Sequence, residues 1–346
     1  SRVTVKKERI HGKILSVTED TVEIEGYGTI PLDENFYVYK LFGEFSVLGA
    51  ADILVGYDLQ EFVAADGKLC AALLERPFDA RTIRVLLMDT GFKNLFHKKA
   101  ELELNCDARL VCKNDDGDSK ESTLKKGEVL TLTAEDERLK HGRMTIIPEK
   151  EEGITICSLE RAQGQPVYSG SLEIKKEEEG LVLINELYLE DYLKKVVPSE
   201  MPASYEKEAL KTQAVCARTY AFMQRKSNTY SAYGAQIDDS TQFQVYNNVE
   251  PDEKTAQAVQ ETYGKMLYYD GNPITAYYFS TSCGTTTNAA IWDSDPEDTP
   301  YLRCLSLQTA RSRLSFADEE EFASFIKNKD FPAYDASYPL YRWNFK

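Results

Sequence analysis

Short alternations of apolar and polar residues, each followed by a tight turn, fill the start of the chain. Residues 13–17 and 21–25 alternate around Glu19-Asp20, and Asp66-Gly67 separates two further apolar runs. A period of two predicts half-buried strands, and an Asp-Gly pair between such runs predicts a hairpin. We therefore expect a small β-barrel or open sheet over residues 1–78, with a boundary near Pro77.

A second series of apolar runs predicts a β-rich domain over residues 79–160. The runs lie at residues 83–88, 100–104, 109–112, 128–133 and 144–147. The acidic run at residues 114–118 lacks the Glu that an EF-hand places after its Gly, so we interpret it as a solvated turn and not as a calcium loop.

Helical periodicity begins only after the apolar run at residues 181–184. Leu189, Tyr192, Leu193 and Val196 share one face, which predicts a helix. Asn185 is the expected N-cap of this helix, and Pro198 is expected to stop it.

Three further helices and a hairpin are expected downstream. The second helix is predicted from about Ser204, its N-cap, to Lys226, the third over residues 255–263 and the fourth over residues 319–327. Strand character returns at residues 266–282 around Asp270-Gly271. The fold class that follows is α+β, with β-rich N-terminal domains before a C-terminal domain at residues 161–346, in which helices pack on antiparallel sheet.

The charge of the chain excludes several classes of partner. A net charge of −16 over 346 residues argues against nucleic acid and against adhesion to anionic lipid, because both need a basic surface. No apolar run approaches the ~20 residues that cross a bilayer. We therefore expect attachment to a membrane only through an anchor outside this sequence.

Three segments of the second half resemble the signature of the SpoIID family of stage II sporulation proteins. The first joins residues 196–202 (VVPSEMP) to residues 208–221 (EALKTQAVCARTYA), the second is residues 240–246 (STQFQVY), and the third is residues 278–284 (YFSTSCG). The resemblance implies lytic transglycosylase activity on peptidoglycan glycan strands. It also implies an extracytoplasmic location and, in engulfing spore-formers, a partner cell-wall amidase.

Glu200 is the candidate catalytic residue. A lytic transglycosylase can work with one carboxyl group, which protonates the glycosidic oxygen and then accepts the proton of the muramic acid C6 hydroxyl. That role needs a pKa near neutrality, which apolar neighbours such as Val197, Pro198 and Met201 favour. The alternative is that Glu200 only caps the following helix.

Six residues are candidates for substrate binding. Lys211 and Arg218 are seven residues apart, hence on one helix face, separated on that stripe only by small residues. The alternative for both is an exposed helix face paired with acidic residues. Amide and hydroxyl groups that could bind N-acetyl sugars come from Gln242, Gln244, Tyr278 and Ser280. For Tyr278 and Ser280, ordinary sheet contacts are the alternative.

No metal or other cofactor is expected. Some SpoIID proteins carry a zinc-binding Cys followed by a His-Cys pair, and the matching positions here are Asp238, Gln242 and Phe243. The chain has three histidines, all before residue 142. Cys216 and Cys283 lie in the first and third segments. The sequence is compatible with a disulfide between them and with a pair of buried free thiols.

Two other functions remain to be weighed. A Cys283 nucleophile would need a histidine base, which the C-terminal half lacks. A non-catalytic glycan-binding module that recruits or enhances a cell-wall amidase is the stronger rival, because the resemblance extends to amidase-enhancer proteins.

Overall fold

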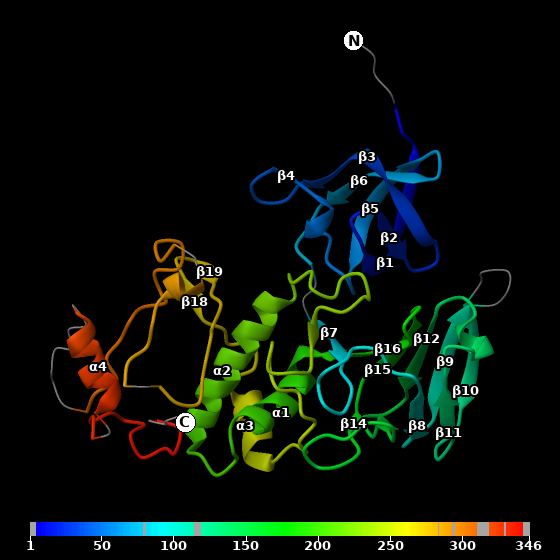
Figure 1. The fold of residues 1–346 in the computed structure, drawn as a ribbon. Coiled ribbons are helices and arrows are strands. Elements are labelled where there is room, and N and C mark those ends of the chain that lie inside the picture. Colours follow the sequence, from blue (N-terminus) through cyan, green and yellow to red (C-terminus); the bar gives the residue numbers. More distant parts are fainter. Residues whose placement is uncertain are drawn as a thin grey trace. The chain divides into compact units, whose positions relative to one another are not determined.

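The computed structural model describes residues 5–78, 81–113, 119–282, 284–292, 295–309, 318–328 and 330–341. Most strands precede the helices along the chain, and the α+β fold class is confirmed (Figure 1). The chain divides into two compact units: residues 1–268 with 273–276, and residues 269–272 with 277–346. Among the residues that the structure describes, no helix has both the length and the apolar character needed to cross a bilayer.

The first sheet is a closed barrel with one added edge strand. Strand β3 pairs with β2 through its first residues and with β6 through its last, so that β3, β6, β5, β1 and β2 form a ring, while β4 pairs only with β3. The strands are β1 (Glu8–Val17), β2 (Thr21–Ile24), β3 (Gly28–Lys40), β4 (Ser46–Leu48), β5 (Asp58–Ala65) and β6 (Lys68–Leu74), with a 3-10 helix η1 (Ala50–Asp52) between β4 and β5.

Alternating apolar positions of these strands fill the barrel. Ile14, Ile24, Phe62 and Leu69 are fully buried, whereas their neighbours along the strands are more exposed. The two hairpins expected in this segment are confirmed, because β1 pairs antiparallel with β2 and β5 pairs antiparallel with β6.

Two more sheets continue the first unit. The larger has seven strands in the order β10-β9-β12-β15-β16-β7-β17, and the smaller has four in the order β11-β8-β13-β14. Their strands are β7 (Thr82–Leu87), β8 (Ala100–Leu104), β9 (Ala108–Lys113), β10 (Ser119–Leu124), β11 (Val129–Leu132), β12 (Arg143–Pro148), β13 (Ile154–Ile156), β14 (Val167–Tyr168), β15 (Ser171–Lys176), β16 (Leu181–Tyr188) and β17 (Ile237–Asp238), and a 3-10 helix η2 (Glu137–Leu139) follows β11. The larger sheet thus combines strands from both sides of residue 160, and the expected boundaries at 78/79 and 160/161 stay predictions.

Three helices pack against one another beside β7 and β16: α1 (Leu189–Glu200), α2 (Lys207–Gln224) and α3 (Glu253–Glu261) (Figure 1). Ala214, Ala217 and Ala221 of α2 are fully buried. The small side chains on this face allow the close approach of neighbouring elements.

The limits predicted for the first helix are wrong at both ends. Asn185 lies inside β16, where its amide donates to the carbonyl groups of Ser169 and Ser171, and the N-cap position is occupied by Tyr188, three residues later. Pro198 lies within α1, which continues to Glu200. Pro198 removes one backbone hydrogen bond, but the Ser199 hydroxyl donates to the Lys195 carbonyl at 2.6 Å and the Met201 N–H to the Val197 carbonyl at 2.9 Å.

The predicted start of the second helix is also wrong. Ser204 lies in a turn that the Tyr205 N–H closes on the Pro202 carbonyl at 3.1 Å, and Glu206 occupies the N-cap position. The rigid φ of Pro202 favours this separate turn over an earlier helix start.

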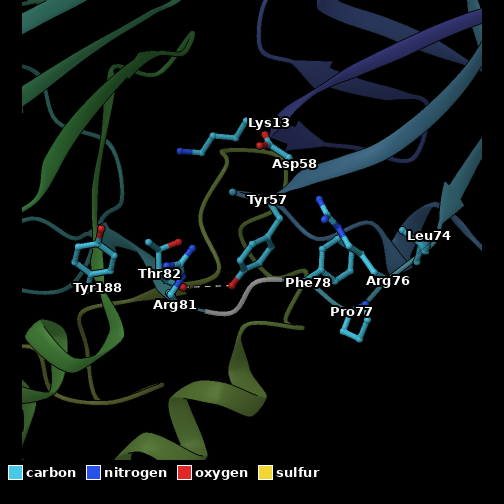
Figure 2. A pocket seen from close by; sticks show the side chains of 11 residues that line it. Lys13, Tyr57, Asp58, Leu74, Arg76, Pro77, Phe78, Arg81, Thr82 and Tyr188 are labelled. Atoms are coloured by element: carbon cyan, nitrogen blue, oxygen red, sulfur yellow. Dashed lines mark hydrogen bonds between the residues drawn. The ribbon is translucent and has the colours of Figure 1, made fainter. Parts of the chain in front are cut away.

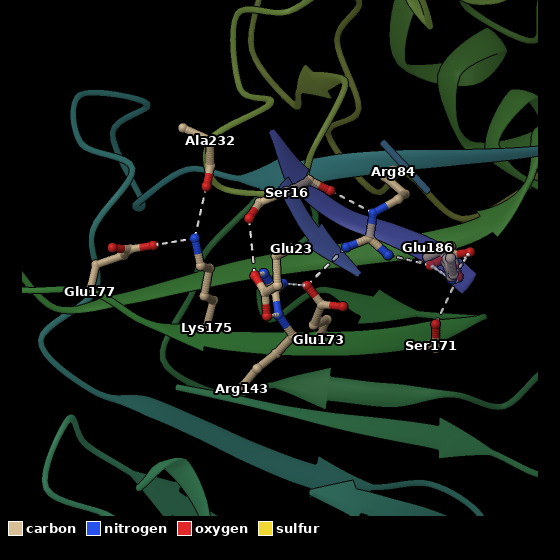
Figure 3. Close-up of polar contacts among 12 residues, drawn as sticks. Ser16, Glu23, Arg84, Arg143, Ser171, Glu173, Lys175, Glu177, Glu186 and Ala232 are labelled. Atoms are coloured by element: carbon tan, nitrogen blue, oxygen red, sulfur yellow. Dashed lines mark hydrogen bonds and ion pairs between the residues drawn. The ribbon is translucent and has the colours of Figure 1, made fainter. Parts of the chain in front are cut away.

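A network of buried ion pairs joins the barrel to the seven-stranded sheet (Figure 3). Arg84 of β7 is 1% exposed and contacts Glu173 at 2.8 Å and Glu186 at 2.5 Å. Glu186 also pairs with Lys13 of β1, and Arg143 connects Glu173 to Glu23 of β2. Because each buried charge has a partner, the barrel is fixed to the sheet by contacts whose loss would leave charges unpaired.

Acid should weaken this network. Burial acts to raise the pKa of Glu173, but Arg143 and Arg84 hold this pKa below its ordinary value of 4.5. Burial likewise acts to raise the pKa of Glu186, and Arg84 and Lys13 hold it below the same value. Since both folded-state pKa values are depressed, the stabilisation is present above about pH 4.5 and is lost as the pH falls through them. The free energy of unfolding, measured in urea, should therefore be lower at about pH 3 than at about pH 7.

The Glu173→Gln protein provides the comparison. Near neutral pH its free energy of unfolding should be lower than that of the parent. On acidification this free energy should fall by less than in the parent, because one titrating carboxyl group of the network is absent. An equal loss in both proteins would contradict the assignment of the acid response to this network.

The described residues of the second unit include the helical elements η3 (Ala289–Trp292) and α4 (Glu319–Lys327). The Asp318 carboxylate caps α4 by accepting from the Glu321 N–H at 2.8 Å. The helix predicted at residues 319–327 is confirmed, and so is the turn at Asp270-Gly271, which joins β18 (Tyr268–Tyr269) to β19 (Asn272–Pro273).

Candidate active site

Glu200 is the last residue of α1 and is half-buried. Its Oε1 accepts a hydrogen bond of 2.8 Å from the backbone N–H of Val245. This bond brings together the first and second of the three signature segments and fixes the direction of the carboxyl group.

The residues next to Glu200 along the chain are largely apolar. Val197 is fully buried, while Pro198 and Met201 are half-buried. The C-terminal end of a helix carries the negative end of its dipole, and the last turn of α1 has no basic residue. This setting disfavours a negative charge at Glu200, while the Val245 N–H favours it, so the two effects oppose each other.

The segment that holds Val245 is anchored on both sides of it. The Gln244 amide donates to the Ala217 carbonyl at 3.2 Å and accepts from the Tyr192 hydroxyl at 3.4 Å. The Tyr246 hydroxyl donates to Asn185 at 3.0 Å, and its ring lies 4.9 Å from that of Tyr192. The Val245 N–H is therefore positioned by buried contacts with α1, α2 and β16.

A buried ion pair fixes the start of the same segment. Asp239 is fully buried and accepts from Arg161 at 2.7 and 3.1 Å and from the Met88 N–H at 2.9 Å. The Asp239 carbonyl accepts from the Tyr246 N–H at 3.2 Å. Burial raises the pKa of Asp239 to about 6, although Arg161 acts in the opposite direction.

Arg218 lies in the interior, although small side chains separate it from Lys211 on α2. It is 1% exposed and forms a two-point ion pair with Glu190 of α1 at 2.7 and 2.8 Å. It also donates to the carbonyl groups of Val259 and Lys265, both at 3.2 Å. This geometry supports a role in holding the three helices together more than a contact with substrate.

Lys211 lies at the surface of α2. Its ammonium group contacts Glu208 at 2.8 Å and Glu261 of α3 at 3.7 Å. The hydrogen bond to Glu208 and the nearby carboxylates raise the pKa of Lys211. For Lys211, the structure therefore matches the alternative that the sequence left open, in which a basic residue on an exposed helix face is paired with acidic residues.

The two glutamines of the second segment lie in different environments. Gln242 is exposed, whereas Gln244 is 1% exposed and holds the backbone as described above. Only Gln242 presents its amide to solvent in this structure.

Tyr278 and Ser280 belong to the second unit. The strand expected through residues 278–282 is wrong, since these described residues form no regular strand. The Ser282 N–H donates to the Asp335 carboxylate at 2.5 Å, and the Tyr277 ring packs on Trp292 with 4.8 Å between centroids. Contacts with side chains thus replace a strand partner here.

The positions that match the zinc ligands of some SpoIID proteins make other contacts in this structure. Asp238 is fully buried and accepts from the Tyr230 hydroxyl and the Ser240 N–H, both at 2.7 Å. Within the described ranges, no group of three or more His, Cys, Asp or Glu side chains is placed to hold a metal ion. The absence of zinc stays a prediction.

Cys216 forms no disulfide in this structure, and Cys283 lies outside the described residues. Cys216 has a free thiol and is half-buried, and burial raises its pKa.

A carboxyl group at a helix end, fixed by the backbone of a neighbouring loop, defines this region as a candidate acid–base site. Residues 177–269, which contain both Glu200 and Val245, match the model of the SpoIID family, described as stage II sporulation protein. The resemblance found in the sequence is thereby confirmed, and the chain carries a SpoIID-family region that includes β16 and α1 to α3.

Similar proteins share this part of the chain. An uncharacterized protein of Brachyspira hyodysenteriae is 38% identical over 146 residues, which are 42% of this chain and 37% of that protein. Stage II sporulation protein D of Bacillus subtilis is 39% identical over 135 residues, or 35% of this chain and 38% of that protein. The amidase enhancer of Bacillus subtilis is 42% identical over 111 residues, or 32% of this chain and 14% of that protein. This chain therefore spans well under half the length of these relatives.

Several groups that shape the site were not predicted. Tyr192 was assigned only to a helix face, and the ion pair of Arg161 with Asp239 joins positions that lie far apart in the sequence. No local pattern reveals such a pair, because an Asp-Asp-Ser-Thr run is equally typical of a solvated turn.

Proposed function

We propose that this chain is a peptidoglycan lytic transglycosylase with Glu200 as its general acid and base. The observation that carries the proposal is the 2.8 Å bond from the Val245 N–H to Glu200, which joins two SpoIID signature segments at one carboxyl group. Further support comes from the family match over the same residues.

The proposed reaction needs one carboxyl group and no water. Protonated Glu200 donates to the oxygen that links MurNAc to GlcNAc, and the bond from the MurNAc C1 to that oxygen breaks. The C6 hydroxyl of the same MurNAc then bonds to C1 while Glu200 takes up its proton. The products are a shortened strand with a new GlcNAc hydroxyl and a 1,6-anhydromuramyl end.

The setting of Glu200 suits this double role. The helix end and the apolar side chains of Val197 and Met201 favour the neutral acid that the first step needs. The Val245 N–H favours the carboxylate that the first step leaves behind. Gln242, which is exposed in the second segment, is the proposed contact to an N-acetyl group, and Lys211, Tyr278 and Ser280 remain candidates.

The proposed place of action is outside the cytoplasmic membrane, where the glycan strands are. Peptidoglycan is the proposed partner, and no cofactor is required by the chemistry.

A second candidate is a non-catalytic glycan-binding module that enhances a cell-wall amidase. It is favoured by the 42% identity to a protein named amidase enhancer. Incubation with purified sacculi, intact or stripped of stem peptides, separates the two. The enzyme should release soluble glycan fragments without any amidase, whereas the module should release none alone and should accelerate an added amidase.

A further inference from the structure

The loop that holds Glu200 is closed at its base. Residues 239–246 follow β17, and the Tyr246 N–H closes them on the Asp239 carbonyl at 3.2 Å. We name these residues the acid-holding loop. Val245, whose N–H donates to Glu200, is the last residue before this closure. A displacement of the base would therefore displace the hydrogen-bond donor of Glu200.

The base of the acid-holding loop is attached to the end of β7. The Asp239 N–H donates to the Leu86 carbonyl at 3.2 Å, and the Asp239 carboxylate accepts from the Met88 N–H at 2.9 Å. The other end of β7 is held by the barrel, because the Tyr57 hydroxyl donates to the Thr82 carbonyl at 3.2 Å (Figure 2). Asp239 thus ties the loop to a strand that is fixed at both ends.

Arg161 completes this attachment from a third segment of the chain. Its guanidinium donates to the Asp239 carboxylate at 2.7 and 3.1 Å and to the Met88 carbonyl at 2.6 Å. The Phe92 ring covers the guanidinium, with 4.5 Å between the Arg161 Cζ atom and the ring centroid. The side chain of Arg161 is 1% exposed and that of Asp239 is 0% exposed. Charge-assisted hydrogen bonds in such a dry setting are strong and fix the geometry of both partners.

The turn that carries Arg161 also holds the chain beyond the acid-holding loop. The Ala162 N–H donates to the Asn247 side chain at 3.1 Å, and the Gln163 side chain accepts from the Glu250 N–H at 2.9 Å. Residues on this turn therefore contact the chain both before and after the position that donates to the candidate acid. The base of the loop is held between this turn and β7.

Two other anchors of the loop attach to different elements. The Gln244 amide donates to the Ala217 carbonyl of α2, and the Tyr246 hydroxyl donates to Asn185 of β16. These bonds fix side chains on either side of Val245, whereas the ion pair fixes the backbone at the base of the loop. If the pair only stabilised the fold, its loss would lower the melting temperature without altering the acidity of the candidate acid.

We infer that Arg161 and Asp239 are positioning residues for Glu200, because their ion pair fixes the loop that carries the Val245 N–H. Neither side chain touches substrate in this role. The importance of the pair for catalysis rests on the proposed function, whereas its effect on the acidity of Glu200 rests on the geometry alone. A hydrogen bond to a carboxylate favours the charged form, so loosening the loop should raise the pKa of Glu200.

The test is the titration of Glu200 in the full chain, followed by NMR of glutamate labelled with carbon-13 at Cδ. The Glu200 signal is assigned by its absence from the Glu200→Gln protein. Arg161→Lys keeps the charge but loses the planar set of N–H groups that binds Asp239. Asp239→Asn removes the carboxylate. Arg143→Lys is the control, since it makes the same change in the buried network between the barrel and the seven-stranded sheet.

Arg161→Lys and Asp239→Asn should each raise the pKa of Glu200 by about one unit, because the weakened bond from the Val245 N–H favours the carboxylate less. The lost charge of Asp239 acts in the opposite direction, since removing a nearby negative charge lowers the pKa of an acid. A rise in both variants therefore reports the position of the donor and not the change of charge. Arg143→Lys should lower the melting temperature and leave the pKa of Glu200 unchanged.

An unchanged or lowered pKa of Glu200 in either folded variant would overturn the inference, and so would an equal rise in Arg143→Lys. Should Asp239→Asn fail to fold, the charge-conserving Arg161→Lys decides alone. The titration is read without any glycan, so its result does not depend on cleavage. A raised pKa in the variants of a chain that cleaves no glycan would support this inference while refuting the proposed function.

Discussion

Glu200→Gln is expected to abolish glycan cleavage, lowering the rate by about 10²–10⁴-fold or more. The amide cannot donate the proton that the glycosidic oxygen needs. Its oxygen can still accept the hydrogen bond that Glu200 receives from the Val245 N–H at 2.8 Å. The melting temperature should therefore stay nearly unchanged, and the comparison measures chemistry and not folding.

The matched control is Glu206→Gln. Glu206 is an exposed glutamate at the N-cap of α2 that makes no side-chain capping hydrogen bond. This substitution removes the same charge six residues downstream and should leave the rate of cleavage as it was. Turnover is measured as soluble muropeptides released from sacculi, and an active Glu200→Gln protein would refute the assigned role.

Arg218→Met should destabilise the protein by about 3 kcal/mol, the low end for a broken buried ion pair. The substitution leaves the Glu190 carboxylate, which is 20% exposed, without its cation. It also removes the guanidinium N–H groups that donate hydrogen bonds to the carbonyls of Val259 and Lys265. The free energy of unfolding in urea reports the change.

Lys211→Met is the control for Arg218→Met. Lys211 is the other cation of the same α2 stripe, but its ion pairs with Glu208 and Glu261 are at the surface. Surface pairs contribute little to stability because water screens them. If the two substitutions had equally small effects on unfolding, Arg218 would not hold the helices, and a direct contact with substrate would again be favoured.

Elements set by local signals could be predicted from the sequence. The helix at residues 319–327 has an Asp cap and acidic residues in its first turn, and α4 has those limits. The turn at Asp270-Gly271 needs positive φ at both residues, which Asp and Gly tolerate well.

Features that depend on contacts elsewhere in the fold could not be predicted from the sequence. Asn185 is a good cap by type, yet its side chain donates to the carbonyls of Ser169, which follows β14, and Ser171 of β15, and accepts from Tyr246. Ser204 is also a good cap by type, but a turn at Pro202 uses the residues around it. At Asn185 tertiary contacts overrode local preference, whereas at Ser204 a competing local turn did so.

The candidate site shows the same division. The apolar frame of Glu200 could be read from its neighbours, and the family motif gave its position. The burial of Arg218 and Gln244 could not be read, because it depends on α1, α3 and the segment at residues 240–246 folding over α2. Residue type indicates what a side chain can bind, whereas burial decides whether a substrate can reach it.

Mass spectrometry of the strand ends made from peptide-stripped glycan tests the transglycosylase proposal most directly. The wild-type chain should produce muramyl ends that are lighter by one water than a hydrolysed end, since the C6 hydroxyl replaces water as the nucleophile. The Glu200→Gln chain should produce none. Reducing muramyl ends from the wild type, or no new ends at all, would contradict the account.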